Sequence, residues 1–161
     1  MFKNLFKKSN SYQIYAPMSG AIVSLEEVPD PVFNQKMMGE GVAMIPTEGK
    51  IVSPIEGKIV QIPDSKHAIG IETDNGIEIL VHIGLETVNL KGKGFTPKVN
   101  LEDLVATGDL LMEFDLDYIH DHAKDVITPI VITNSKNSDK QFAITEEKEG
   151  KAGVTEIITV S

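Results

Sequence analysis

Residues 65–95, SKHAIGIETDNGIEILVHIGLETVNLKGKGF, decide the predicted fold. Two runs rich in β-branched residues, 67–73 and 77–83, flank the tripeptide Asp74-Asn75-Gly76. Asn-Gly between such runs is the strongest short-range sequence signal for a β-hairpin with a two-residue loop. We therefore expect an antiparallel hairpin in which Asn75 and Gly76 form the loop.

This loop predicts which residues oppose each other across the hairpin. Ile69 would face His82, and His67 would face Gly84. Directly opposed side chains point to one side of a sheet, and that side recurs at every second residue. His67 and His82 are then expected on one face as diagonal neighbours, with roughly 7 to 8 Å between their backbones. Gly84 would leave room beside His67.

Two imidazoles on one face of a hairpin form a candidate site. Neutral histidine is nucleophilic, basic and metal-ligating at neutral pH. A single histidine in an apolar strand is more often a hydrogen-bonded packing residue, and the shared face is what favours a functional reading of His67 and His82. Both strands are apolar on both sides, so packing should hold the rings in place.

The rest of the chain indicates many short strands. Pro and Gly recur about every ten residues, a spacing that favours strands over helices. The sequence APMSGAIV at 16–23 is echoed by SPIEGKIV at 53–60, each a Pro-x-x-Gly turn that leads into an alternating strand. We expect two related β-units packed on each other. The predicted fold class is all-β, a barrel-sandwich of antiparallel strands with short helical turns.

Length, composition and charge limit the function classes. A chain of 161 residues is long enough for one domain with a real core, which we place at 14–161. The absence of cysteine rules out disulfides and zinc-cysteine sites and fits a cytoplasmic location. A net charge of −9 argues against a nucleic-acid partner. No apolar run approaches the ~20 residues of a membrane span.

Residues 1–13 form a separate leader. Its first eight residues, MFKNLFKK, place apolar side chains at i, i+3 and i+4 among three lysines. One interpretation is an amphipathic turn that touches anionic lipids weakly through residues 1–8. The other is a flexible leader, because so short a helix is marginal on its own.

A second histidine pair lies in His120-Asp121-His122. A His-x-His sequence on a strand can chelate a metal. The segment 117–126 is instead the best helix candidate, and residues two apart on a helix point in nearly opposite directions. We expect these two histidines on the solvated surface. The segment 28–41 is expected to be a loop with one helical turn.

The central stretch also resembles a known family. The run GIEILVHIGLETV at 76–88, preceded by His67-Ala68 and followed by LKGKGF at 90–95, is similar to the glucose-type enzyme IIA of the bacterial phosphoenolpyruvate-dependent sugar phosphotransferase system. Further matches are APMSG at 16–20, VPD at 28–30, Phe33, GD at 108–109 and EFDL at 113–116. The resemblance covers most of the chain. It implies a single EIIA type-1 domain with the duplicated hybrid motif of that family.

The resemblance also implies an activity, which is that of a phosphotransferase acting as a histidine phosphocarrier. His82 would accept a phosphoryl group from HPr and pass it to the IIB domain of a sugar permease, and His67 would support the transfer. Ser65 lies two residues before His67, where its hydroxyl can orient the ring; the family usually has threonine there. The partner rim would contain Asp30, Val32, Phe33 and Glu86. Val32 and Phe33 have no strand to join, so the alternative for these two is a position in the core. Glu86 stands where the family commonly has aspartate, so the charge is kept.

Other classes of protein remain open at this point. A lipoyl or biotinyl carrier needs a lysine at a hairpin tip, and the tip here is Asp-Asn-Gly. A zinc hydrolase needs a third protein ligand beside His67 and His82. A zinc-binding or regulatory interaction module could use the same pair as half of a metal site completed by a partner's carboxylate. For the phosphocarrier we expect no obligatory cofactor, and zinc would be bound only at a partner interface. Regulated transporters or enzymes are further candidate partners.

Overall fold

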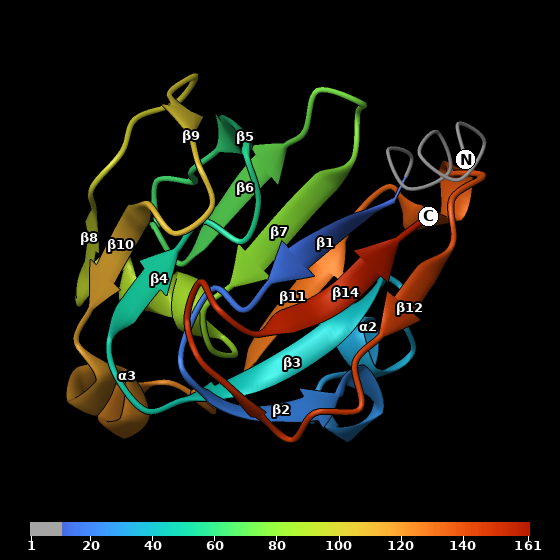
Figure 1. Cartoon of the computed structure of the whole chain (residues 1–161). Coiled ribbons are helices and arrows are strands. Elements are labelled where there is room, and N and C mark those ends of the chain that lie inside the picture. Colours follow the sequence, from blue (N-terminus) through green and yellow to red (C-terminus); the bar gives the residue numbers. More distant parts are fainter. Residues whose placement is uncertain (1–10) are drawn as a thin grey trace, which may run out of the picture.

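The computed structural model describes residues 11–161, and antiparallel β-strands make up most of this part of the chain (Figure 1). The strands are β1 (Tyr12–Tyr15), β2 (Gly20–Ser24), β3 (Glu40–Pro46), β4 (Lys50–Val52), β5 (Gly57–Gln61), β6 (Ala68–Glu72), β7 (Glu78–His82), β8 (Phe95–Pro97), β9 (Leu104–Val105), β10 (Leu110–Phe114), β11 (Thr128–Ile132), β12 (Phe142–Ile144), β13 (Glu149–Gly150) and β14 (Glu156–Val160). The helical turns are η1 (Leu25–Glu27), α2 (Pro31–Asn34), η2 (Thr87–Leu90), α3 (Leu116–His122) and η3 (Ser135–Asn137). The predicted all-β class is confirmed.

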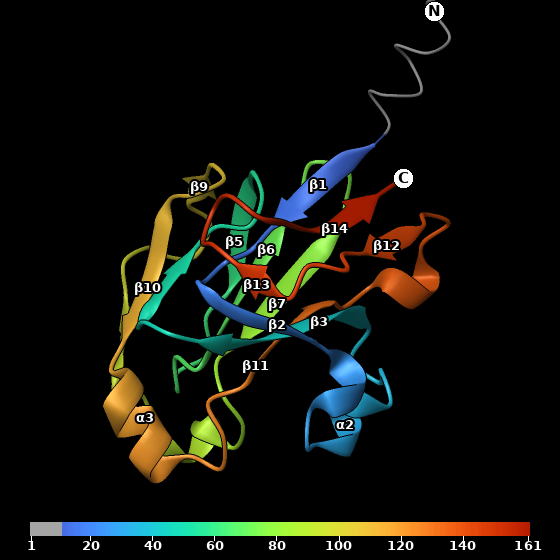
Figure 2. The ribbon, with the colours of Figure 1, turned by 60° about the horizontal axis from the view of Figure 1, so that its bottom comes forward.

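The strands form three sheets. The largest has eight strands in the order β13-β2-β3-β11-β7-β6-β5-β9, and the two smaller sheets have the orders β1-β14-β12 and β4-β10-β8. The large sheet therefore holds β7 in its middle, between β11 and β6. In Figure 2, α2 and α3 both lie at the lower end of the molecule, away from the tip of the β6–β7 hairpin.

One apolar core joins the three sheets. It includes Ile14 of β1, Leu111 of β10 and Ile69, Val81 and Ile130 of the large sheet, all fully buried. Burying one such aliphatic side chain stabilises the fold by about 1.5 to 3 kcal/mol. The central hairpin is therefore held by packing, as the sequence indicates.

A second apolar cluster covers the other face of the central strands. Ala68 of β6, Leu80 of β7 and Val131 of β11 pack there with Val28 and Phe33. Strands that are buried on both faces carry continuous apolar runs instead of a strict alternation. This accounts for the unbroken apolar character of β7 and β11, whose ranges the sequence places correctly to within a residue or two.

The two Pro-x-x-Gly turns lead into β2 and β5, as the internal repeat predicts. Both strands join the large sheet, where β2 pairs with β3 and β5 pairs with β6. Because β1 begins at Tyr12, the last two residues assigned to the leader belong to a sheet instead. The predicted lipid contact of residues 1–8 lies outside the described residues. No helix within residues 11–161 is long and apolar enough to cross a membrane.

The central hairpin forms, but its register differs from the predicted one. Ala68 faces His82, and Ile69 faces Val81. The loop has three residues, because the amide of Gly76 donates to the carbonyl of Thr73 at 2.9 Å and the amide of Thr73 donates to the carbonyl of Ile77 at 2.9 Å. Gly76 has a φ of 87°, which fits a three-residue loop that ends in a left-handed residue. The predicted two-residue loop is wrong, and one added residue shifts every opposed pair by one.

The helical turns mostly follow the sequence signals. The segment 28–41 contains one helical turn, α2, as expected. The helix predicted at 117–126 is the shorter α3, which Asp115 caps by accepting a hydrogen bond from the amide of Tyr118 at 3.0 Å. His120 and His122 are exposed on α3, as expected for residues two apart on a helix.

Candidate functional site

The imidazole rings of His67 and His82 contact each other. Their centroids lie 4.8 Å apart, and the rings meet edge to face at 80°. His82 is the last residue of β7, and His67 directly precedes β6. The pairing of these two histidines is confirmed.

The register is not what brings the two rings together. The carbonyl of His67 accepts a hydrogen bond from the amide of Ile83 at 2.7 Å, so the backbone of His67 lies opposite Ile83 and not opposite Gly84 as predicted. In a regular strand that pairing would send His67 and His82 to opposite faces. His67 lies outside β6 and follows Lys66, whose φ is 57°. Because His67 lies outside β6, the alternation of a regular strand does not apply to it, and its ring meets His82.

The ring of His82 is held in a defined tautomer. Its Nδ1 lies 2.9 Å from the carbonyl oxygen of Gly84. Since a carbonyl oxygen only accepts hydrogen bonds, Nδ1 of the neutral ring carries the proton, and the lone pair is left on Nε2. The ring of Phe33 packs against His82 with a centroid distance of 5.0 Å. The free nitrogen of His82 is therefore presented by a ring that is fixed from two sides.

The ring of His67 is fixed by Ser65. The Ser65 hydroxyl lies 2.6 Å from Nδ1 of His67, within hydrogen-bond distance. The contact predicted from their two-residue spacing is therefore present. A serine hydroxyl can donate or accept, so it supports either tautomer of the neutral ring.

Both histidines are neutral at pH 7. Burial first, and the neighbouring His82 second, lower the pKa of His67 from 6.5 to about 4. Burial also lowers the pKa of His82, although its hydrogen bond to Gly84 and the charge of Asp30 act in the opposite direction. Neutral imidazole has the lone pair that nucleophilic attack requires, so the environment of the pair favours this chemistry.

The four predicted rim residues occupy different places around the histidines. Asp30 caps α2 by accepting a hydrogen bond from the amide of Val32 at 2.9 Å. Val32 is 40% exposed, whereas Phe33 is only 5% exposed and packs under His82. Glu86 is exposed, with a left-handed φ of 59°. Phe33 is therefore part of the support of His82 and not of an exposed rim, because the turn of α2 directs it inward.

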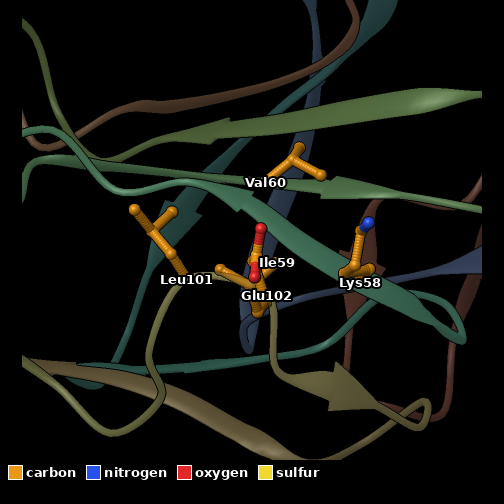
Figure 3. Close-up of a pocket in the computed structure, with 5 residues that line it drawn as sticks. All are labelled: Lys58, Ile59, Val60, Leu101 and Glu102. Carbon is orange, nitrogen blue, oxygen red and sulfur yellow. The ribbon is translucent and has the colours of Figure 1, made fainter.

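Two hollows of the surface lie away from the histidine pair. A hollow of about 320 Å³ is lined by Lys58, Ile59, Val60, Leu101 and Glu102 (Figure 3). A second, of about 670 Å³, lies between Glu56, Glu72 and Leu104. Residues 11–161 contain no group of three or more side chains placed to hold a metal ion. His67 and His82 are both half-buried, so each ring keeps part of its surface exposed to solvent.

The sequence does not reveal the role of the Gly84 carbonyl. Gly84 is expected only to leave space, yet its carbonyl oxygen determines which nitrogen of His82 is free. Its φ of 71° lies in the left-handed region, which turns this carbonyl back toward the ring two residues earlier. A glycine two residues after a histidine at a strand end is the signal that points to such a contact.

Comparisons with known proteins agree with this geometry. Residues 12–138 match the family model of the phosphoenolpyruvate-dependent sugar phosphotransferase system, EIIA 1. The chain is 49% identical to the PTS system glucose-specific EIIA component of Staphylococcus aureus (strain COL), over 100% of this chain and 99% of that protein. The component of the same name from Staphylococcus epidermidis (strain ATCC 12228 / FDA PCI 1200) is 48% identical over the same shares.

A solved structure shares the fold. The structure of glucose permease IIA from Mycoplasma capricolum superposes with a TM-score of 0.86 at 37% identity, and the match covers 92% of this chain and 95% of that one. Family model, full-length relatives and solved structure all agree. The chain therefore belongs to the EIIA 1 family of the phosphoenolpyruvate-dependent sugar phosphotransferase system.

Proposed function

We propose that Nε2 of His82 carries the phosphoryl group in this phosphocarrier. The family consists of phosphotransferases, and the chain accordingly takes a phosphoryl group from HPr and passes it to the IIB domain of a sugar permease. The observation that carries the assignment is the hydrogen bond from Nδ1 of His82 to the Gly84 carbonyl. It leaves Nε2 as the only nucleophilic nitrogen of that ring.

The transfer can be written with every bond accounted for. The lone pair on Nε2 of His82 attacks the phosphorus of phosphohistidine on HPr. A new N–P bond forms while the N–P bond of the donor breaks, and the donor imidazole keeps the electron pair of that bond. In the second transfer, the nucleophile of the IIB domain forms a bond to phosphorus while the bond between phosphorus and Nε2 of His82 breaks, and His82 keeps the electron pair of that bond. Such in-line transfers depend mainly on alignment and on stabilising the charge of the phosphoryl oxygens.

His67 is the proposed donor to those oxygens. When the Ser65 hydroxyl donates to Nδ1 of His67, the proton of the neutral ring resides on Nε2. That N–H can then donate to a phosphoryl group on the neighbouring His82. With a pKa of about 4, His67 stays neutral and adds no fixed positive charge. A neutral donor supports the transition state without trapping the phosphoryl group in a tight ion pair, and a relay needs this property.

The surface around the pair is the proposed docking site for both partners. It combines exposed apolar side chains, Val32 on α2 and Val88 on η2, with the carboxylates of Asp30 and Glu86. Val32 and Val88 are 40% and 52% exposed. Transient signalling and relay interfaces are small and mix apolar with polar contacts. We infer that HPr and the IIB domain bind here in turn.

The names of the relatives support a glucose-type permease as the acceptor. We also propose a cytoplasmic location, because the histidine pair and the phosphoryl donor HPr would have to meet in the same compartment. The absence of cysteine fits that location.

Phosphorus NMR and intact-mass measurement after mixing with phosphorylated HPr test the assignment. The wild-type chain should gain one acid-labile phosphoryl group, and His82→Gln should gain none, because an amide nitrogen has no nucleophilic lone pair. His67→Gln should still accept phosphate but pass it on about 30- to 1000-fold more slowly, as expected for losing one aligned donor worth about 2 to 4 kcal/mol. Stoichiometric phosphate on His82→Gln would refute the assignment.

A further inference from the structure

We infer that Thr87 and Thr128 are positioning residues: their hydroxyls hold the backbone at Gly84 and thereby fix the tautomer of His82. The inference rests on the proposed role of His82 and extends it to two side chains that do not touch the ring. Both threonines are fully buried. A buried hydroxyl is costly unless it is hydrogen-bonded, so the groups that each one contacts indicate its role.

The two hydroxyls hold the peptide group that precedes Gly84 from both sides. The Thr87 hydroxyl donates to the carbonyl of Ile83 at 2.6 Å. The amide of Gly84 donates to the Thr128 hydroxyl at 3.3 Å. The Thr128 hydroxyl in turn donates to the carbonyl of Val126 at 3.0 Å, so its own proton is used as well. The carbonyl and the N–H of this one peptide are thus both held by buried side chains.

The following peptide group is the one that contacts His82. Its carbonyl, that of Gly84, accepts from Nδ1 of His82 at 2.9 Å. Its N–H, that of Leu85, donates to the carbonyl of Asp125 at 2.9 Å. Two consecutive peptides are therefore fixed on either side of the Gly84 Cα. Rotation of the first peptide would turn the second and move the acceptor away from His82.

The packing around Gly84 shows that this backbone has little freedom to adjust. A Cβ at Gly84 would lie 2.8 Å from Cγ2 of Thr87 and 2.9 Å from the carbonyl oxygen of Asp125. The Thr87 side chain therefore contacts Gly84 with its methyl group and holds the preceding carbonyl with its hydroxyl. Loss of either threonine hydroxyl would remove a hydrogen bond to the backbone at Gly84 and leave the volume of the side chain nearly unchanged.

The consequence for chemistry is a choice between two nitrogens. When the Gly84 carbonyl is in place, the proton of neutral His82 is on Nδ1 and the lone pair is on Nε2. When the carbonyl is displaced, the proton is free to occupy Nε2, and this form cannot attack phosphorus from that atom. The threonines would thus raise the fraction of His82 that is competent to accept the phosphoryl group.

The tautomer ratio of His82 can be read directly from the ¹⁵N chemical shifts of its ring at pH 7.5. Thr128→Val and Thr87→Val keep the shape of the side chain and remove the hydroxyl. We expect each to shift the ratio toward the Nε2–H form by about fivefold, the equivalent of one neutral hydrogen bond. The initial rate of phosphoryl uptake should fall accordingly. Thr128→Ser and Thr87→Ser, which keep the hydroxyl, should restore both measurements.

Thr73→Val is the matched control. The Thr73 hydroxyl also accepts a hydrogen bond from a backbone amide, that of Ile77 at 3.1 Å, but at the hairpin tip. Its removal should lower stability while leaving the tautomer of His82 unchanged. A merely structural role for Thr87 and Thr128 would make all three valine variants behave alike.

Two results would overturn the inference. One is an unchanged tautomer ratio in folded Thr87→Val or Thr128→Val. The other needs no variant: fast hydrogen exchange of the Gly84 amide in the wild-type protein would show that the peptide is not held. Neither measurement depends on phosphate, so a failure of the inference is distinct from a failure of the His82 assignment, which would appear as phosphate on another residue.

Discussion

Acidification should destabilise this fold through His67. The pKa of His67 is lowered from 6.5 to about 4 by burial first and by His82 second. Between these two values the unfolded chain binds a proton that the folded chain does not bind. The free energy of unfolding therefore rises with pH between pH 4 and 6.5. The contribution from keeping His67 neutral is fully present above pH 6.5 and is progressively lost as the pH falls toward 4.

The size of this effect follows from the pKa. A lowering of this extent corresponds at most to about 3 kcal/mol in the free energy of unfolding. The ring of His67 is only half-buried, so screening by water reduces the expected effect to about 1 to 2 kcal/mol. Burial of His82 acts in the same direction, since its pKa is also lowered.

Urea unfolding at pH 7.5 and pH 4.5 measures the effect. Carboxylates also titrate in this range, so the informative quantity is the difference between wild type and His67→Gln. The variant should lose about 1 to 2 kcal/mol less than the wild type between the two pH values. Substitution of the exposed His120 with glutamine controls for the general effect of removing a histidine. Equal losses in wild type and His67→Gln would show that burial of the ring does not disfavour its protonation.

Two further predictions concern the backbone and metal binding. Gly84→Ala should lower the free energy of unfolding by at least about 2 kcal/mol, because the φ of 71° and the close neighbours of Gly84 both oppose a Cβ. Gly76→Ala should lower it by only about 1 kcal/mol, because Gly76 has a φ of 87° but open space around it. Similar melting temperatures for the two variants would contradict this expectation. Zinc titrated calorimetrically into the isolated chain should bind no more tightly than micromolar, since His67 and His82 supply only two of the four ligands of a tetrahedral site. Nanomolar binding that survives His120→Ala would show that a further side chain ligates the metal.

The sequence predicts the hairpin and its two histidines but not how they meet. Asn75-Gly76 correctly marks the turn, yet the choice between a two-residue and a three-residue loop depends on hydrogen bonds made by Thr73. That choice shifts the register, and regular alternation would then separate the rings. The rings meet because His67 lies outside β6, where the alternation of a regular strand does not apply. The sequence carries no clear signal for the residue at which β6 begins, so the predicted pairing of the rings is correct although the predicted register is wrong.

The supporting groups of the site were predicted unevenly. Ser65 is recognisable because a hydroxyl two residues before a histidine can reach its ring. From the sequence, Gly84 is interpreted only as open space, although a glycine two residues after a histidine can place its carbonyl near the ring. The buried Thr128 has no local pattern, because it contacts Gly84 across 44 positions of the chain. For Phe33 the sequence leaves a core position and an exposed rim as alternatives, since the direction of its side chain depends on the packing of α2.

The helical turns beside the histidines have an evolutionary consequence. α2 carries the exposed Val32 next to Phe33, which packs under His82. η2 carries the exposed Val88 next to Thr87, whose hydroxyl holds the carbonyl of Ile83. A lineage can therefore vary Val32 and Val88 on the proposed docking surface, whereas exchange of a whole turn would also replace a residue that supports the reactive pair. Variants that exchange only Val32 and Val88 between paralogues should change the affinity for partner proteins and keep the tautomer of His82.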